Sequence, residues 1–247
     1  MSKIRIELHI PRTLADITLG QYQEYLKILK GLRKDKKEDD ELTDGEIEFL
    51  NKKSLQIFCN VELNDTYKLP LSAFMVALES VQTCFSEETP LIKEFTFKDS
   101  EGITQEMGFI PRLDEMTFGE YVDLDSFIGD WDNMHKAMAI LFRPKRIISK
   151  QRYKIAEYEA EATLDAYSEA MKEMPVNIAL GAVVFFYRLG MKLAEGMTSY
   201  LENHKELSKE YKSRLPEGGV GIPALLRSQM ATSLNLMRYQ RFHSVKP

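Results

Sequence analysis

The stretch that decides the fold is Ile110–Tyr121, which reads IPRLDEMTFGEY. A closely similar stretch stands earlier in the chain at Ile10–Tyr22, which reads IPRTLADITLGQY and has one residue inserted after the arginine. Repeated spacing of this kind is typical of a duplicated supersecondary unit. The sequence therefore predicts that the chain is built from two related units.

Each copy of the stretch has the signature of a helix start. Thr18 and Thr117 can act as N-caps, and Gln21 and Glu120 follow at the spacing of a capping box. The apolar residue before each cap and the tyrosine after it are the two partners of a hydrophobic staple. A cap contributes about 1 kcal/mol. We therefore interpret these residues as structural caps that fix where each helix begins.

The composition is that of an ordinary globular protein. The chain has 247 residues, of which 44% are apolar and 29% are charged, and its net charge is −5. This charge argues against a general affinity for nucleic acid. No apolar run is long enough to cross a membrane, so we expect no membrane contact. Cys59 and Cys84 lack the spacing of a metal or redox site, and we predict buried thiols in a reducing compartment.

The first unit is expected to begin with a strand and to continue with three helices. Residues 4–10 alternate between apolar and polar, as in a half-buried strand that ends at Pro11. The capped helix follows, a second capping box opens a helix at Thr43, and Pro70 opens the third helix.

The second unit repeats these landmarks in the same order. Residues 93–109 alternate on both sides of a turn and predict a β-hairpin, which would join the N-terminal strand in a sheet of about three strands. Helices are then predicted after Thr117, near Asp130 and after Pro175. An extra segment, Tyr153–Lys172, is rich in Ala, Glu and Tyr and is predicted to be helical.

The C-terminal residues differ in character from the rest of the chain. Residues 216–223 are rich in Gly and Pro and indicate a flexible joint. The amphipathic, basic arm behind this joint carries the candidate interaction residues Leu226, Arg227, Met230, Leu234, Met237, Arg238 and Arg241. The arm could pack on its own domain, dock on a neighbouring subunit or bind an acidic surface. We favour a protein partner, because so few positive charges bind nucleic acid only weakly.

Residues with chemical potential do not form a recognisable site. The aspartates at 123, 125, 130 and 132 lack the ligand spacing of a calcium loop, and we interpret them as N-cap charges and solvated side chains. Residues 218–221 are rich in Gly but are not followed by the Lys-Ser/Thr of a phosphate loop. The four histidines stand in separate elements. We predict no catalytic, cofactor-binding or metal-binding residues, although paired carboxylates assembled by the fold would leave no motif.

Three stretches carry a resemblance to a known group of proteins. They are residues 16–22 (DITLGQY), 117–125 (TFGEYVDLD) and 131–144 (WDNMHKAMAILFRP). The chain resembles structural and assembly proteins of tailed phages, including crAss-like phages of Bacteroidetes hosts, over residues 10–30 and 105–200. The resemblance implies a virion component or tail-assembly factor that works with copies of itself or of a neighbour. It implies no catalytic residues.

Together these observations predict a mainly α (α+β) protein with two related helical units, each preceded by a strand, a small antiparallel sheet and a C-terminal arm. The predicted domains are 1–111, 112–215 and the arm 216–247. The expected function is that of a non-catalytic virion structural protein of the tail or head–tail connector region, present as a homo-oligomer among other phage structural proteins. The alternatives are a tail-assembly chaperone that is absent from mature particles and, from another class, an enzyme whose site the sequence does not reveal.

Overall fold

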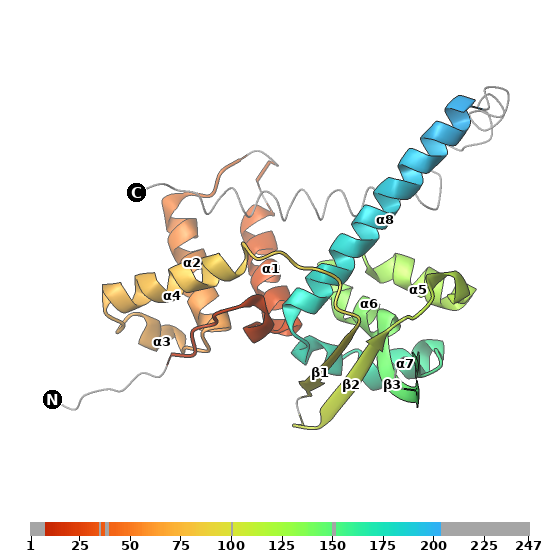
Figure 1. Ribbon diagram of the computed structural model, residues 1–247. Helices are drawn as coiled ribbons and strands as arrows, with labels where there is room; N and C mark the ends of the chain where they lie inside the picture. Colours follow the sequence, from red (N-terminus) through yellow and green to blue (C-terminus); the bar gives the residue numbers. More distant parts are fainter. Residues whose placement is uncertain (1–7, 35, 38–39, 100, 150–151, 204–247) are drawn as a thin grey trace.

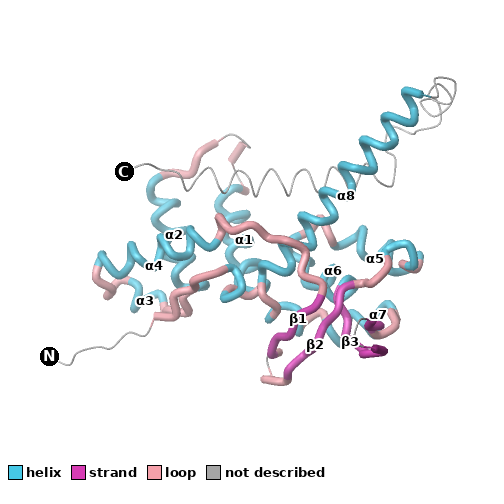
Figure 2. Tube along the Cα trace, in the orientation of Figure 1, coloured by secondary structure: helices cyan, strands magenta, loops and turns pink. Residues whose placement is uncertain are grey.

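Helices make up most of the fold, and a small sheet lies on one side of them (Figures 1 and 2). The computed structural model describes residues 8–34, 36–37, 40–99, 101–149 and 152–203. In Figure 1 the elements of the first unit lie to the left of helix α1 (Leu19–Arg33), and the sheet and most helices of the second unit lie to its right. Helix α1 therefore occupies the middle of the molecule.

The first unit consists of helices that follow the predicted landmarks. A 3-10 turn, η1, precedes α1 and is followed along the chain by α2, the short α3 and α4; their bounds are η1 Leu14–Asp16, α2 Asp44–Phe58, α3 Leu63–Thr66 and α4 Leu71–Cys84. Thr43 caps α2 with a capping box, and Pro70 stands at the N-cap of α4. Both starts lie where the sequence predicts them.

The sheet has four antiparallel strands in the order β1-β2-β3-β4. Their bounds are β1 Glu94–Lys98, β2 Thr104–Phe109, β3 Phe142–Ser149 and β4 Arg152–Ile155. The predicted hairpin is β1–β2. Its turn depends on Gly102, whose φ of 79° is costly for other residues, and on the Asp99 carboxylate, which accepts the backbone N–H of Ile103 at 2.9 Å.

The second unit begins with the same local structure as the first. A 3-10 turn, η2, precedes helix α5, as η1 precedes α1. The remaining elements are η3, α6, α7, η4 and the long helix α8; the bounds are η2 Leu113–Glu115, α5 Phe118–Phe127, η3 Trp131–Asn133, α6 Met134–Leu141, α7 Ala160–Tyr167, η4 Ala170–Glu173 and α8 Val176–Asn203. No helix in the described part of the chain is long and apolar enough to cross a membrane.

The apolar start of α8 packs against the sheet. Phe109 of β2 forms edge contacts with Phe142 of β3 and Phe185 of α8, with ring centroids 5.2 and 5.9 Å apart. The loop that enters β1 crosses the same helix, and a Cβ at Gly181 would lie 2.3 Å from the Pro90 carbonyl oxygen. Glycine at this position is therefore required by the close approach of the loop backbone.

Three of the predicted strand and helix assignments need correction. Residues 8–10 are in no strand, although the His9 N–H donates to the Cys59 carbonyl at 3.3 Å; residues 4–7 lie outside the described part. The hairpin instead pairs with β3. The sequence did not predict this strand, because it contains Pro144, which lacks a backbone donor. The predicted helix over Tyr153–Lys172 is wrong at its start, where β4 ends at Ile155, and only α7 and η4 follow.

The predicted domain limit at residue 111 stays a prediction. The hairpin that precedes this limit forms one sheet with strands that follow it, because Met107 pairs with Pro144 and Phe109 with Phe142. The predicted class, mainly helical with a small antiparallel sheet, is confirmed.

Candidate functional site: the joint between the units and the exposed helix faces

Both repeated stretches form complete capping boxes. The Thr18 N–H donates to Gln21 Oε1 at 2.9 Å, and the Gln21 N–H donates back to Thr18 Oγ1 at 3.2 Å. In the second copy the Thr117 N–H donates to Glu120 Oε2 at 2.6 Å, and the Glu120 N–H donates to Thr117 Oγ1 at 3.3 Å. The predicted structural caps are therefore present in both units.

The capping side chains also connect each first helix to a later element, which is helix α2 for Gln21 and strand β3 for Glu120. Gln21 Nε2 donates to the Ile57 carbonyl at 2.7 Å, near the end of α2. Glu120 Oε1 lies 2.5 Å from Nη2 of Arg143, which follows α6. Sequence reasoning missed this second role, since nothing in the local pattern identifies the distant partner. Each capping residue thus fixes both a helix start and a contact with a later element of the chain.

Glu120 and Arg143 form a buried ion pair inside the second unit. The Arg143 guanidinium lies 5.6 Å from the ring centre of Tyr158, whose hydroxyl donates to the Asp123 carboxylate at 2.5 Å. Burial and the hydrogen bond to Asp123 raise the pKa of Tyr158. Within the described structure, Nε and Nη1 of Arg143 have no hydrogen-bond partner. A guanidinium does not release its proton. We interpret this group as a charged anchor for α5.

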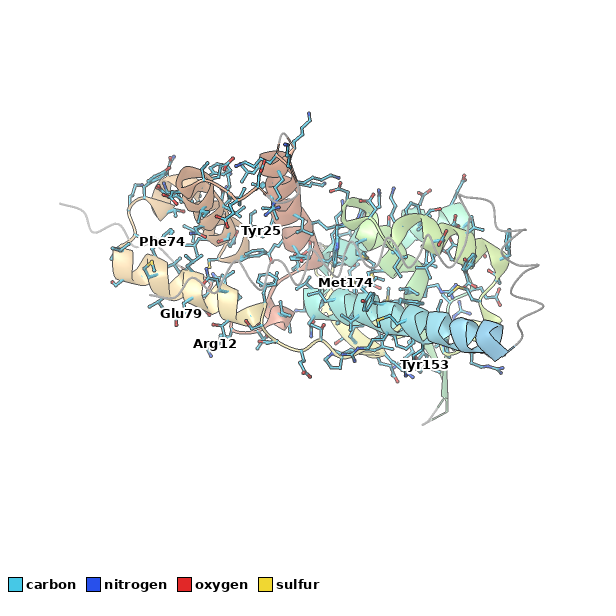
Figure 3. All side chains as sticks on the ribbon, turned by 90° about the horizontal axis from the view of Figure 1, so that it is seen from above. Arg12, Tyr25, Phe74, Glu79, Tyr153 and Met174 are labelled. Atoms are coloured by element: carbon cyan, nitrogen blue, oxygen red, sulfur yellow. The ribbon has the colours of Figure 1, made fainter. Side chains whose placement is uncertain are left out.

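A joint between α1 and α8 connects the two units. Thr18 and Pro175 form an antiparallel backbone bridge. The Leu19 N–H donates to the Met174 carbonyl at 2.9 Å, and the Val176 N–H donates to the Ile17 carbonyl at 2.8 Å. Figure 3 shows Met174 at the start of α8, beside α1. Leu19 and Val176 are both 0% exposed, so the two helix starts bury each other.

A buried polar contact supports the same joint. Gln23 of α1 donates from Nε2 to the Trp131 carbonyl at 2.6 Å and lies 3.1 Å from Nδ1 of His135. Burial and, after it, the positive charge of Lys172 lower the pKa of His135 to about 4. The imidazole is therefore neutral at pH 7, which leaves Nδ1 free to accept from Gln23. Tyr22 packs edge-on against the Trp131 ring at 5.1 Å.

Exposed apolar side chains cover parts of two other helices. The α5 face consists of Phe118, Tyr121 and Val122, which share one side of α5 by their spacing; Phe118 is 83% exposed. The α4 face consists of Leu71 and Met75, and Leu71 is 76% exposed. The two helices lie on opposite sides of α1 (Figure 1). Large apolar side chains gathered on one helix face indicate a site for a protein partner.

The remaining predicted residues lie apart from these faces. Asp130 caps η3 by accepting the Asp132 N–H at 3.0 Å, and Asp132 pairs with Lys30 at 2.8 Å, which are the structural and surface roles expected of them. Cys59 and Cys84 are buried free thiols, as predicted. The arm residues, from Leu226 to Arg241, lie outside the described part of the chain. Within the described part, no group of three or more His, Cys, Asp or Glu residues could hold a metal ion.

Comparisons with known proteins return no relative. No protein-family model matches the chain, and no curated protein or solved structure is significantly similar to it.

The buried ion pair predicts a large effect of one neutral substitution. We expect Glu120→Gln to lower the free energy of unfolding by about 3–5 kcal/mol, because it leaves the Arg143 charge buried without a counter-charge. The double variant Glu120→Gln/Arg143→Met should recover a large part of this loss, because it removes the stranded charge. Urea unfolding measures both, and a single variant within about 0.5 kcal/mol of wild type would contradict the pair's role.

The lowered pKa of His135 predicts a loss of stability on acidification. The unfolded chain binds a proton near pH 6.5 and the folded chain only near pH 4, so the stability is fully present above pH 6.5 and is lost as the pH falls towards 4. From pH 7 to pH 5 this histidine should remove about 2 kcal/mol. The difference between wild type and His135→Gln in urea unfolding at both pH values isolates it. An equal loss of stability in wild type and in His135→Gln would contradict the buried, neutral state of His135.

Proposed function

We propose that this protein is a non-catalytic structural protein of a tailed-phage virion, in the tail or head–tail connector region, that acts by protein–protein assembly. The exposed α5 face carries this proposal. Phe118, Tyr121 and Val122 leave water only when another surface covers them, and burial of apolar area is the main favourable contribution to protein association.

Two further observations support an assembly role. The α4 face offers a second apolar surface, and helix α4 lies on the opposite side of α1 from helix α5 (Figure 1). Separate surfaces on opposite sides suit a subunit that contacts a neighbour on each side. The resemblance of residues 117–125 and 131–144 to phage structural and assembly proteins agrees with this role. It also supports the proposed partners, which are other phage structural proteins and copies of this chain.

A tail-assembly chaperone is the alternative that the exposed faces also support, since a chaperone holds its clients through apolar surface. The two functions differ in whether the protein stays in the finished particle. A structural protein remains there in stoichiometric amounts, whereas a chaperone leaves during assembly.

Mass spectrometry of purified particles tests the proposal. In particles of the phage that encodes this chain, we expect its peptides at a copy number comparable to those of other minor structural proteins, and we expect them to persist through gradient purification. Peptides present in the infected-cell lysate but missing from the particles would replace the structural role with the chaperone role. A matched set of host cytoplasmic proteins measures carry-over.

A further inference from the structure

The joint between the units buries one residue from each repeat, and the equivalent residue in the other repeat is exposed. Leu19 and Val176, which meet at the joint, are 0% exposed. The equivalent residues are Phe118, one position after the cap Thr117, and Leu71, one position after Pro70; these are 83% and 76% exposed. The chain therefore uses one pair of helix starts internally and leaves the corresponding pair uncovered.

The same contrast continues along the first helix of each unit. Tyr22 is buried against Trp131, whereas its equivalent, Tyr121, is exposed. Gln23 is a buried polar residue that hydrogen-bonds across the joint, whereas its equivalent, Val122, is exposed and apolar. An exposed valine beside two exposed aromatic rings is unfavourable for a helix face that stays in water.

The repeated glycine gives an independent indication. A Cβ at Gly20 would lie 3.1 Å from the Lys172 carbonyl oxygen, so glycine there allows the backbone of η4 to approach α1. Gly119 is its equivalent on α5 and has no atom within 4 Å of the same position. Glycine lowers helix stability relative to most other residues, and nothing in the described part of the chain requires it at Gly119. A backbone from another molecule would require it.

The first unit supplies a surface that matches this requirement. Tyr67 precedes Pro70 by the same spacing as Lys172 precedes Pro175, so the two residues are equivalent. Tyr67 is 66% exposed. Leu71 and Met75 continue from it along α4, where the equivalent residues of α8, Val176 and Leu180, are buried. The backbone at Tyr67 and the α4 face therefore correspond to the η4 backbone and the buried start of α8.

We propose that the α5 face of one copy binds the α4 face of a second copy, with Thr117 bridging Pro70 as Thr18 bridges Pro175 within the chain. Because the two faces differ and belong to helices on opposite sides of α1, the contact is head to tail. Its repetition gives a ring if the rotation closes and a filament if it does not. The inference rests on the proposed assembly function for its biological meaning and names the chain itself as the partner.

A mixing experiment tests the head-to-tail contact with full-length chains. Phe118→Asp blocks the α5 face, and Leu71→Asp blocks the α4 face. We expect wild type to form oligomers at ~0.1 mM, where contacts with micromolar Kd are saturated. Alone, each variant should self-associate with a Kd that is higher by on the order of 30-fold or more. An equimolar mixture should form a one-to-one dimer, because each variant keeps the face that the other lacks. Light scattering after size exclusion measures the masses, and circular dichroism confirms that both variants fold.

A second variant tests the contact without placing a charge in it. Gly119→Gln adds a side chain where the described residues of the chain leave open space, so we expect an unchanged or higher Tm and self-association at least ~10-fold weaker. Gly31→Gln is the matched control, because Gly31 lies near the end of α1 with no atom within 4 Å of its Cβ position. It should leave self-association unchanged.

Several outcomes would overturn the inference. These are a wild-type chain that stays monomeric at ~0.1 mM, a mixture that stays monomeric, and an unchanged oligomer in either single variant. Loss of assembly in Leu226→Asp/Met230→Asp, with Leu71→Asp unaffected, would make the C-terminal arm the occupant of the α5 face. If the chain assembles head to tail but is missing from particles, only the proposed function is refuted. If the chain is present in particles and both variants assemble unchanged, only this inference is refuted.

Discussion

The backbone bridge between Thr18 and Pro175 is the contact on which the arrangement of the two units depends. Its two hydrogen bonds satisfy N–H groups at the starts of α1 and α8, where Ile17, Leu19, Met174 and Val176 are all buried. A buried N–H without a partner costs about 1–3 kcal/mol. The bridge therefore fixes the register of the two helix starts, and the Gln23 hydrogen bonds to the neighbouring η3 turn fix the orientation of α1.

The duplication explains why the chain has a buried joint and an exposed version of the same surface. Each unit begins with a 3-10 turn and a threonine-capped helix, and each has a later helix that begins after a proline. Within one chain, α1 contacts the start of α8, but α5 and α4 lie on opposite sides of α1 and do not meet (Figure 1). The equivalent surfaces of α5 and α4 are therefore left uncovered within the described part of the chain, and we propose a second copy as the partner that covers them.

The parts of the fold that depend on local sequence could be predicted, and the parts that depend on distant partners could not. Helix starts depend on hydrogen bonds or backbone limits within a few residues, so the local pattern is sufficient to predict them. This holds for the starts at Thr18, Thr117, Thr43 and Pro70. Strand β3 contains Pro144, a residue type that lacks a backbone donor and is rare within strands, so only the pairing with β2 reveals it. The sequence likewise could not show that Glu120 meets Arg143 or that Leu19 is covered while Phe118 is not, because Arg143 and the residues that cover Leu19 lie many residues away along the chain.

Cysteine cross-linking tests directly whether the joint between α1 and α8 recurs between copies of the chain. Thr18 and Pro175 are a directly opposed antiparallel pair without mutual hydrogen bonds, a geometry with Cα atoms about 4.5 Å apart that suits a disulfide. Thr18→Cys/Pro175→Cys should therefore oxidise to a disulfide within one chain. Thr117→Cys/Pro70→Cys should oxidise to disulfides between chains, giving a ladder of covalent oligomers on a non-reducing gel. Monomer alone from the second variant, while the first closes its internal disulfide, would contradict the claim that the joint recurs between copies.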